Sequence, residues 1–441
     1  MQAQHDLQRI LDTALAAIPS TPIALALSGG LDSTALLHAL SSSLAARQRG
    51  LRAIHIDHGL HAQSGDWSQH CQRICAQCDV PLTVVKVVVK QTAGTGLEAS
   101  ARAARYAAFE LELDAGEILA LAHHRDDQTE TVLLKLLRGA GPEGLGAMRT
   151  LRRLGEAWAW RPLLEVGREE LRRHASQAGL EWIEDPSNHD IRIERNFLRH
   201  EVLPTLRKRW PRADASIAQS ARWIRAAADF VEIESSRALA SLRGFDPATL
   251  DWRRWLALAD ALRDPVLRCW LRGLGLAEPN QHQVGELERQ LAQASDDKLP
   301  CVRWPGAELR RYRDLLYATR PMDLPEPGWE SSWNGLPLVL PAGLGTLTLE
   351  GYANQGIALR ETADLVVRFR RGGERLRLDP GGYHRELRDL FQETGIPPWQ
   401  RARIPIVLDH KARLLAVGDL WISDIGRTEF ARLERTLSWS R

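Results

Sequence analysis

Cysteine, net charge and long apolar runs are all scarce in this chain of 441 residues. The five cysteines are odd in number and scattered, which favours a reducing cytosol over a disulfide-stabilised secreted scaffold. The net charge is only +2, so binding of nucleic acid must rest on local basic patches. No apolar run is long enough to span a membrane, and residues 1–18 form an amphipathic segment unlike a signal peptide. We therefore expect a cytoplasmic protein without a membrane partner.

The stretch 24–37, ALALSGGLDSTALL, lacks the lysine of a Walker A loop, because no Gly-Lys-Ser/Thr follows its glycines. Its apolar start predicts a buried parallel strand, and after two adjacent glycines its apolar residues recur at helical spacing. The first N–H groups of a helix have no internal acceptor, and the helix dipole favours negative charge there. The stretch therefore predicts an anion site between a strand and a helix.

Polar side chains in this turn indicate which anion binds. Ser28, Ser33 and Thr34 add hydroxyl donors, whereas the carboxylate of Asp32 repels phosphate unless a cation lies between them. We therefore expect a magnesium-bridged nucleotide with Asp32 as the metal contact. An ordinary glycine-rich turn is the competing interpretation, but six ordered positions after a strand are far more specific than a pair of glycines.

Ser-Gly-Gly-x-Asp-Ser resembles the PP-loop of the ATP-pyrophosphatase superfamily. Enzymes of that superfamily hold the pyrophosphate of ATP and transfer AMP to a substrate oxygen. The resemblance implies ATP and Mg²⁺ as cofactors. It also implies a set of nucleotide-binding residues, namely Ser28, Gly29, Gly30, Leu31, Asp32 and Ser33.

Two further predicted strands, 51–60 and 117–122, end in or lead into polar residues. Ligands of open parallel sheets bind beyond the carboxyl ends of the strands, so Asp57 and His58 are expected to contact the nucleotide. The second strand leads into His123–Thr131, HHRDDQTET, whose acids crowd the start of a predicted helix. Acids at a helix N-terminus are favourable dipole partners. Three acids and two histidines are more than a helix N-terminus needs to balance its dipole. They predict a second magnesium site or an amine-binding carboxylate cluster.

Cys71, Cys75 and Cys78 match the spacing of a radical-SAM cluster motif, and the last two match the Cys-x-x-Cys of tRNA thiolases. Positions i, i+4 and i+7 also form one stripe of a helix, where cysteine packs as a small apolar residue. We expect packing to be their role.

Basic residues gather in three places outside these motifs. Arg102 and Arg105 share one helix face, six basic residues lie between Asp190 and Arg209, and nine arginines lie between Arg368 and Arg403. Phe391 and Trp399 interleave with the last group, a combination that fits phosphate contact and base stacking on RNA. For each residue taken singly, a solvated basic face remains the alternative.

Together these segments resemble the tRNA(Ile)-lysidine synthases. The segments that carry the resemblance occur in order along the first half of the chain: Ser28–Ser33, Ile56–Leu60, Leu97–Ala99 with Arg102, His123–Thr131, Arg161–Leu164, Asp185–Asn188 and Arg195–Asn196. The resemblance implies an α/β fold with three domains. These are an N-terminal Rossmann-like parallel-sheet PP-loop domain that binds ATP (1–209), a helical tRNA-binding middle domain (210–320) and a small Arg-rich α+β C-terminal domain that binds tRNA (334–441).

The resemblance also implies a ligase reaction on the wobble cytidine of tRNA(Ile) with a CAU anticodon. ATP adenylates the base, and the amine of free L-lysine then displaces AMP to give lysidine, AMP and pyrophosphate. We expect Asp127 and Glu130 to bind the lysine ammonium, and His124 to transfer a proton. Arg102 and Arg195 would hold the base or the developing charge, and Asp32 the magnesium ion. Both a monomer and a homodimer are compatible with the sequence.

Three rival interpretations remain. A tRNA thiolase would use Cys75 and Cys78, and a GMP or NAD synthetase would share the PP-loop. The second fits less well, because the chain has no visible glutaminase segment. A non-catalytic tRNA-binding protein would carry a degenerate loop, whereas every expected polar position is present here.

Overall fold

The computed structural model describes residues 2–57, 59, 64–88, 97–295, 298–351 and 364–440. The chain forms two compact units, Met1–Ile233 and Glu234–Arg441, which join within the long helix α11 (Ala213–Leu242). The predicted boundaries of the three domains stay a prediction. No helix among the described residues is long and apolar enough to cross a membrane.

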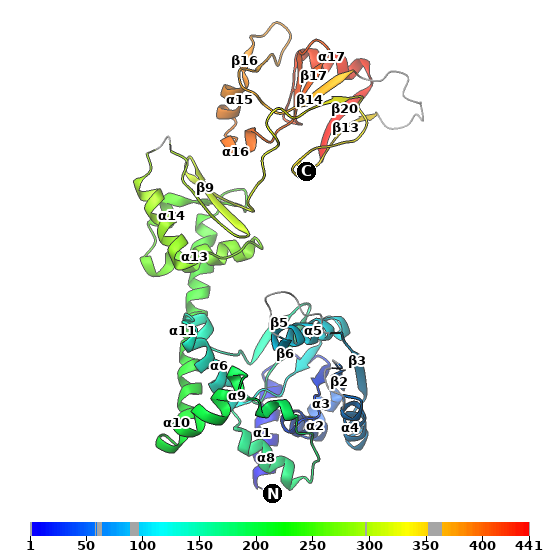
Figure 1. The fold of residues 1–441 in the computed structure, drawn as a ribbon, viewed down its shortest axis with the longest axis vertical. Coiled ribbons are helices and arrows are strands. Elements are labelled where there is room, and N and C mark those ends of the chain that lie inside the picture. Colours follow the sequence, from blue (N-terminus) through cyan, green and yellow to red (C-terminus); the bar gives the residue numbers. More distant parts are fainter. Residues whose placement is uncertain are drawn as a thin grey trace. The chain divides into compact units, whose positions relative to one another are not determined.

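A six-stranded sheet forms the centre of the first unit (Figure 1). Five strands run parallel, and only the edge strand β5 is antiparallel to its neighbour β6. In spatial order the strands are β3 (Leu82–Lys86), β2 (Leu51–Asp57), β1 (Ile23–Ala26), β4 (Ile118–Ala120), β6 (Ala157–Trp160) and β5 (Leu151–Leu154). The predicted parallel-sheet fold is therefore confirmed.

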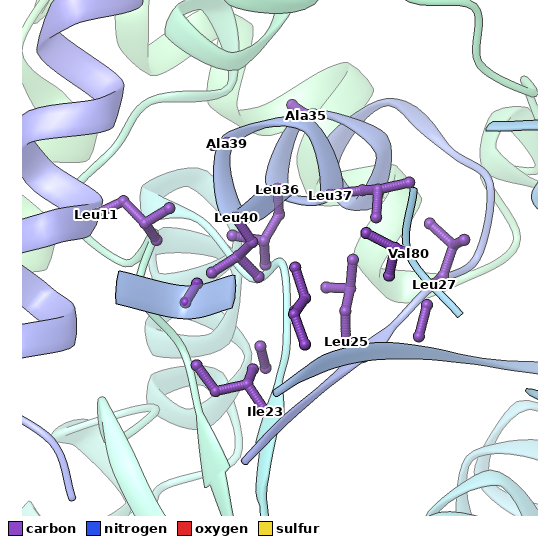
Figure 2. Close-up of a cluster of buried hydrophobic side chains, with 14 of the residues drawn as sticks. Leu11, Ile23, Leu25, Leu27, Ala35, Leu36, Leu37, Ala39, Leu40 and Val80 are labelled. Carbon is purple, nitrogen blue, oxygen red and sulfur yellow. The ribbon is translucent and has the colours of Figure 1, made fainter. Parts of the chain in front are cut away.

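The central strands β1 and β4 are buried on both faces of the sheet, which explains why they are apolar runs without alternation. Ile23 and Leu25 of β1 face one cluster of side chains, and the intervening Ala24 faces a second cluster. This alternation follows from the period of two along a strand. Figure 2 shows the first cluster, where leucines of α2 lie over β1. Truncation of the fully buried Leu36 to alanine would cost about 2–5 kcal/mol of stability.

Helices cover the two faces of the sheet. Buried residues of α1, α2, α4 and α8 join the first cluster, and residues of α5 join the second. The helices of this unit are α1 (Gln2–Ala16), α2 (Leu31–Ser42), α3 (Leu44–Gln48), α4 (Ser64–Gln77), α5 (Leu97–Glu112), α6 (Arg125–Leu137), α7 (Pro142–Leu145), α8 (Arg168–Gln177), a 3-10 turn (Pro186–His189), α9 (Glu194–Phe197), a π-helical turn (Leu198–Val202) and α10 (Leu203–Arg209).

The two cysteines of α4 and Cys78, which directly follows the helix, pack in the apolar core, as expected. Cys71 and Cys75 are buried in the first cluster, and Cys78 packs against it. Burial raises the pKa of the Cys71 and Cys75 thiols to about 12, so both stay protonated at neutral pH.

The second unit begins with helices that pack against a four-stranded antiparallel sheet. The helices are α12 (Trp252–Leu256), α13 (Asp260–Gly273) and α14 (Gln281–Gln293), and the sheet has the order β7 (Thr249–Asp251), β10 (Leu315–Thr319), β9 (Ala307–Tyr312) and β8 (Cys301–Trp304). The sequence predicted only the helices. The sequence pattern does not indicate the strands, because they are short and rich in arginine. Only alternate side chains of β8, Val302 and Trp304, are buried.

The rest of the second unit is a small α+β region, as predicted. Its five-stranded sheet has the order β11 (Glu330–Trp333), β14 (Leu365–Arg368), β17 (Ile406–Asp409), β18 (Leu414–Val417) and β19 (Trp421–Ile422). A three-stranded sheet is formed by β12 (Leu338–Val339), β13 (Thr346–Gly351) and β20 (Arg435–Ser440), and a two-stranded sheet by β15 (Arg375–Leu376) and β16 (Arg385–Glu386). The helices of this region are α15 (Leu387–Glu393), α16 (Pro398–Arg401) and α17 (Asp424–Arg432).

Phe391 and Trp399 belong to the packed interior of this unit. Phe391 is 1% exposed, and Trp399 is 8% exposed with its ring edge-on to Tyr312 and Tyr317. The interpretation that these two rings stack on RNA bases was therefore wrong. The sequence places them beside arginines, but it does not reveal that both rings are enclosed.

Candidate active site

The glycine turn after β1 has the geometry of an anion-binding loop. Gly29 has a φ of +81°, which favours glycine, and a Cβ there would lie 3.1 Å from both Cys71 Sγ and Ile183 Cδ1. Gly30 precedes α2, and the hydroxyl oxygens of Ser28 and Ser33 lie 3.0 Å apart at the helix start. The N-terminus of α2 and these hydroxyls therefore face the same space.

Asp32 lies in the first turn of α2 and supplies a carboxylate oxygen without a partner. Its Oδ1 is buried and has no hydrogen-bond partner among the described residues, and Arg168 Nε is 3.9 Å away. An unpaired carboxylate oxygen beside a phosphate loop suits a hard cation such as Mg²⁺, which prefers one or two carboxylates together with phosphate oxygens and water. In the described part of the chain, no group of three or more His, Cys, Asp or Glu side chains forms a metal cage. Asp32 thus fits a magnesium ion that a nucleotide brings with it.

His124 is fully buried at the start of α6 and connects two carboxylates. Its Nε2 lies 3.5 Å from Asp32 Oδ2 and 3.5 Å from Asp127 Oδ2. Burial opposes protonation of the ring, but Asp127, Asp32 and Asp126 outweigh burial and raise the pKa of His124 above 6.5. The imidazolium form is therefore favoured at this position.

Asp127 is held as a carboxylate. Burial raises its pKa, but the charges of His124 and Arg195 dominate and hold the pKa well below its usual range. The backbone N–H of His124 donates to Asp127 Oδ2 at 3.0 Å, and Arg195 Nη2 donates to Oδ1 at 3.0 Å. This group presents a fixed negative charge.

The other two acids of the HHRDDQTET segment have different partners. Asp126 accepts from Arg207 Nη2 at 2.8 Å and from the backbone N–H of Arg168 at 3.0 Å, and so ties α10 and α8 to α6. Glu130 is 0% exposed, and its carboxylate accepts hydrogen bonds from Arg195 and Arg199. All three acids therefore contact arginines, and of the three only Asp127 also lines the cavity described below.

His123 differs from its neighbour. Burial lowers the pKa of His123 to about 3, so its imidazole is neutral at physiological pH. Its Nδ1 has no hydrogen-bond partner within the described part of the chain. A neutral ring nitrogen at the cavity wall can accept or donate a hydrogen bond to a bound base.

A cavity of about 680 Å³ connects the phosphate loop with Asp127. It lies beyond the carboxyl ends of β1, β2 and β4, where the sequence predicted that the polar residues would meet. Seven of the predicted site residues line it: Ser28, Gly30, Leu31, Asp32, Ser33, Asp57 and Asp127.

The remaining predicted residues lie elsewhere. Gly29, His124, Glu130 and Arg195 lie behind the wall, in contact with residues that line it. Arg102 is exposed and its guanidinium covers the Tyr106 ring at 5.1 Å. His58 lies outside the described residues.

Several residues of the wall were not selected from the sequence. These are Trp67, Arg105, Tyr106, His123, Arg168, Arg172, Trp182, Glu184, Asp185, Asn188, His189, Arg199 and His200. One signal was available for some of them, because Arg168 and Arg172, like Arg195 and Arg199, stand four residues apart on one helical face. Nothing in the sequence indicates that these faces turn toward the sheet edge.

A glycine turn into a helix N-terminus, an aspartate with one carboxylate oxygen free of hydrogen bonds to the described residues and an adjoining cavity at the ends of parallel strands define a PP-loop protein of the ATP-binding class. Family models agree with this assignment over three segments. A PP-loop domain matches residues 3–206, a TilS substrate binding domain matches 250–317, and a TilS substrate C-terminal domain matches 365–439.

Curated relatives resemble nearly the whole chain. A tRNA(Ile)-lysidine synthase of Xanthomonas axonopodis pv. citri is 43% identical over 412 residues, which cover 93% of this chain and 92% of the relative. One of Xylella fastidiosa is 44% identical over 91% of each chain, and one of Methylococcus capsulatus is 36% identical over 94% of each. The chain belongs to the tRNA(Ile)-lysidine synthase family.

Proposed function

We propose that this protein joins free L-lysine to the wobble cytidine of a tRNA(Ile) with a CAU anticodon, at the expense of ATP. The observation that carries the proposal is the single cavity that connects the phosphate loop with the carboxylate of Asp127. A nucleotide site and an amine site in one cavity suit an enzyme that activates one substrate with ATP and then joins an amine to it. The names of the curated relatives support the same reaction.

ATP binds at the turn before α2 in this proposal. The N-terminus of α2 and the hydroxyls of Ser28 and Ser33 hold the phosphates. Asp32 holds the magnesium ion, whose charge favours departure of pyrophosphate when it is bound. Asp57, at the end of the neighbouring strand, contacts the rest of the nucleotide.

The cytidine is held by cationic and aromatic side chains of the wall. RNA-binding proteins commonly stack unpaired bases on aromatic rings or guanidinium planes. Tyr106, Trp182 and Arg105 offer such surfaces inside the cavity. Arg102 does not line the cavity itself. Arg105, one turn further along α5, is the better-placed cation.

The lysine ammonium binds Asp127, whose fixed negative charge lies at the cavity wall. The amine attacks only after it loses a proton, so an acceptor is needed close to it. His124 lies behind Asp127, and in our proposal the proton reaches the imidazole through the Asp127 carboxylate. Because the raised pKa of His124 favours the imidazolium, only the neutral form of the ring can accept this proton, and that form becomes more abundant as pH rises.

In this proposal the three predicted domains have different roles. Residues 1–209 carry out catalysis, and residues 210–320 and 334–441 hold the tRNA. A second cavity, of about 510 Å³, supports the assignment for the last region, because Arg368, Arg375, Arg377, Arg413 and His384 line it. Several of these arginines pair with acids of their own region, for example Arg377 with Asp424. Phosphates of the tRNA would compete for such partly exposed pairs, which contribute little stability by themselves.

Incubation with a tRNA(Ile) transcript, ATP and labelled lysine tests the proposal. We expect the label to enter the tRNA while AMP and pyrophosphate appear in equal amounts. A tRNA whose anticodon is not CAU serves as the control and should stay unlabelled. Release of pyrophosphate without incorporation of lysine at any lysine concentration would overturn the proposed amine substrate.

A further inference from the structure

Glu130 lies next to the amine site, yet it is enclosed by two arginines. We propose that Arg199 is a positioning residue, which together with Arg195 and Glu130 forms a clamp that fixes the Asp127 carboxylate for the lysine amine. In this proposal Glu130 holds the arginines rather than the lysine. The inference rests on the proposed function, because it assigns the amine to Asp127.

Two arginines hold the carboxylate of Glu130. Arg195 Nε donates to Oε2 at 2.6 Å, and Arg199 donates through Nε to Oε1 at 2.7 Å and through Nη2 to Oε2 at 3.0 Å. Both carboxylate oxygens are engaged, and the side chain has no exposed surface. An ammonium could bind Glu130 only by displacing a guanidinium from a buried, charge-assisted contact.

The same two arginines also contact Asp127. Arg195 Nη2 donates to Asp127 Oδ1 at 3.0 Å, and Arg199 Nη2 lies 3.5 Å from the same oxygen. The other oxygen accepts from the backbone of His124. Asp127 is therefore fixed on both sides, and Asp127 and Arg199 are the members of this group that reach the cavity.

Local structure explains how two arginines reach one carboxylate. Arg195 is the second residue of α9, and Arg199 lies in the π-helical turn that follows. Inserted π turns often occur at functional sites, where they redirect side chains. Asn196 between them is buried and donates to the carbonyl oxygens of Ser187 and Asp190, which anchors the segment on the neighbouring loop.

The clamp also explains why four charged groups can be buried together. Two guanidinium groups face two carboxylates, so the charges balance, and Arg–carboxylate geometry is favourable for paired hydrogen bonds. Loss of one member leaves its partners unpaired in a buried place. Removing Arg199 should therefore disturb Glu130 first and Asp127 through it.

Steady-state kinetics of Arg199→Gln test the proposal. We expect the KM for lysine to rise about ten- to a hundredfold, the range for loss of a charge-assisted hydrogen bond. The KM for ATP and the rate of pyrophosphate release without lysine should change less than about threefold. Arg199→Lys keeps the charge and should recover part of the lysine affinity. Arg192→Gln is the matched control, because Arg192 lies on the same segment but its side chain is 88% exposed.

A double-variant cycle separates the clamp from direct contact of Glu130 with lysine. If Glu130 acts through Arg199, Glu130→Gln and Arg199→Gln have overlapping effects, and the double variant is no worse than the poorer single variant. The inference would be overturned if the two substitutions multiplied each other's effect on the KM for lysine in the double variant. An unchanged KM for lysine in Arg199→Gln would overturn it as well. An unchanged KM for ATP and an unchanged rate of pyrophosphate release show that a variant is folded. If Arg199→Gln does not fold, Arg199→Lys is measured in its place. Should the wild-type protein fail to incorporate lysine, the proposed function fails instead.

Discussion

His124 Nε2 lies 3.5 Å from Asp32 Oδ2, which joins the first turn of α6 to the first turn of α2. His124 follows β4, and Asp32 follows the glycine turn after β1. The strands β1 and β4 are neighbours in the sheet. Through this contact the amine side of the cavity and the phosphate side share one charged network. The network gives the protein a pH dependence with a definite sign.

The stability of the protein should depend on pH through His124. Its pKa is higher in the folded state, so protonation stabilises the fold fully below about pH 6.5, and this stabilisation is lost as pH rises through the folded-state pKa. Asp127 acts in the opposite direction, because its pKa is lowered and its contribution is lost only in acid. We expect His124→Gln to lower stability by about 1–3 kcal/mol near pH 6, with a smaller loss at higher pH.

Thermal unfolding of wild type and His124→Gln from about pH 5.5 to about pH 8.5 checks this expectation. The difference in Tm between them should shrink as pH rises. His410→Gln, at an exposed histidine, is the control and should give a constant difference. A difference that grows with pH would contradict the assigned direction of the shift.

Gly29→Ala should impair ATP binding. The residue has a φ of +81°, and the new Cβ would lie only 3.1 Å from Cys71 Sγ, so the phosphate loop must move. We expect a KM for ATP about tenfold higher or more, and a stability loss of about 1–2 kcal/mol. Gly65→Ala is the matched control, because Gly65 lies in α4 with open space around it and should accept alanine. Equal ATP kinetics in the two variants would exclude a special role for the Gly29 conformation.

Asp32→Asn should alter the response to magnesium. The carboxylate oxygen without a partner would become a neutral amide oxygen or nitrogen, which binds a hard cation poorly. We expect half-maximal pyrophosphate release to need about tenfold more Mg²⁺, an effect of one charge in a partly buried site. Titration of Mg²⁺ at saturating ATP measures it. An unchanged Mg²⁺ requirement would remove Asp32 from the metal site.

Arg375→Gln should weaken tRNA binding without affecting ATP. Arg375 is exposed and lines the second cavity. Loss of one phosphate contact lowers the slope of log Kd against log salt by about one. Filter binding of tRNA at several salt concentrations measures this slope. Arg289→Gln is the control, because Arg289 is exposed on α14 and pairs with Glu286 of its own helix. If both substitutions alter the slope equally, the second cavity is not a specific tRNA contact.

Much of the candidate site could be predicted because parallel strands end on one edge. Ser28, Asp57 and His123 are distant in sequence, yet each follows a buried strand of the same sheet, so their convergence follows from topology. The glycine turn was equally predictable, since only a few residue types allow its backbone conformation.

Pairings between distant side chains could not be predicted in this way. The arginines that enclose Glu130 come from 65 and 69 residues further along the chain, and no local pattern indicates which acid they reach. The enclosure of Phe391 and Trp399 likewise depends on tertiary packing. For these residues the sequence gives the chemistry, whereas the fold decides the partner.

Analysis of the modified nucleoside tests the central claim most directly. After reaction of wild-type protein with tRNA(Ile), ATP and lysine, the tRNA is digested to nucleosides. The masses of the nucleosides are then measured by mass spectrometry. We expect the wobble cytidine to gain the mass of one lysine minus one water, with no other nucleoside changed. A wobble nucleoside that keeps the mass of cytidine, or that carries sulfur in place of lysine, would contradict the account.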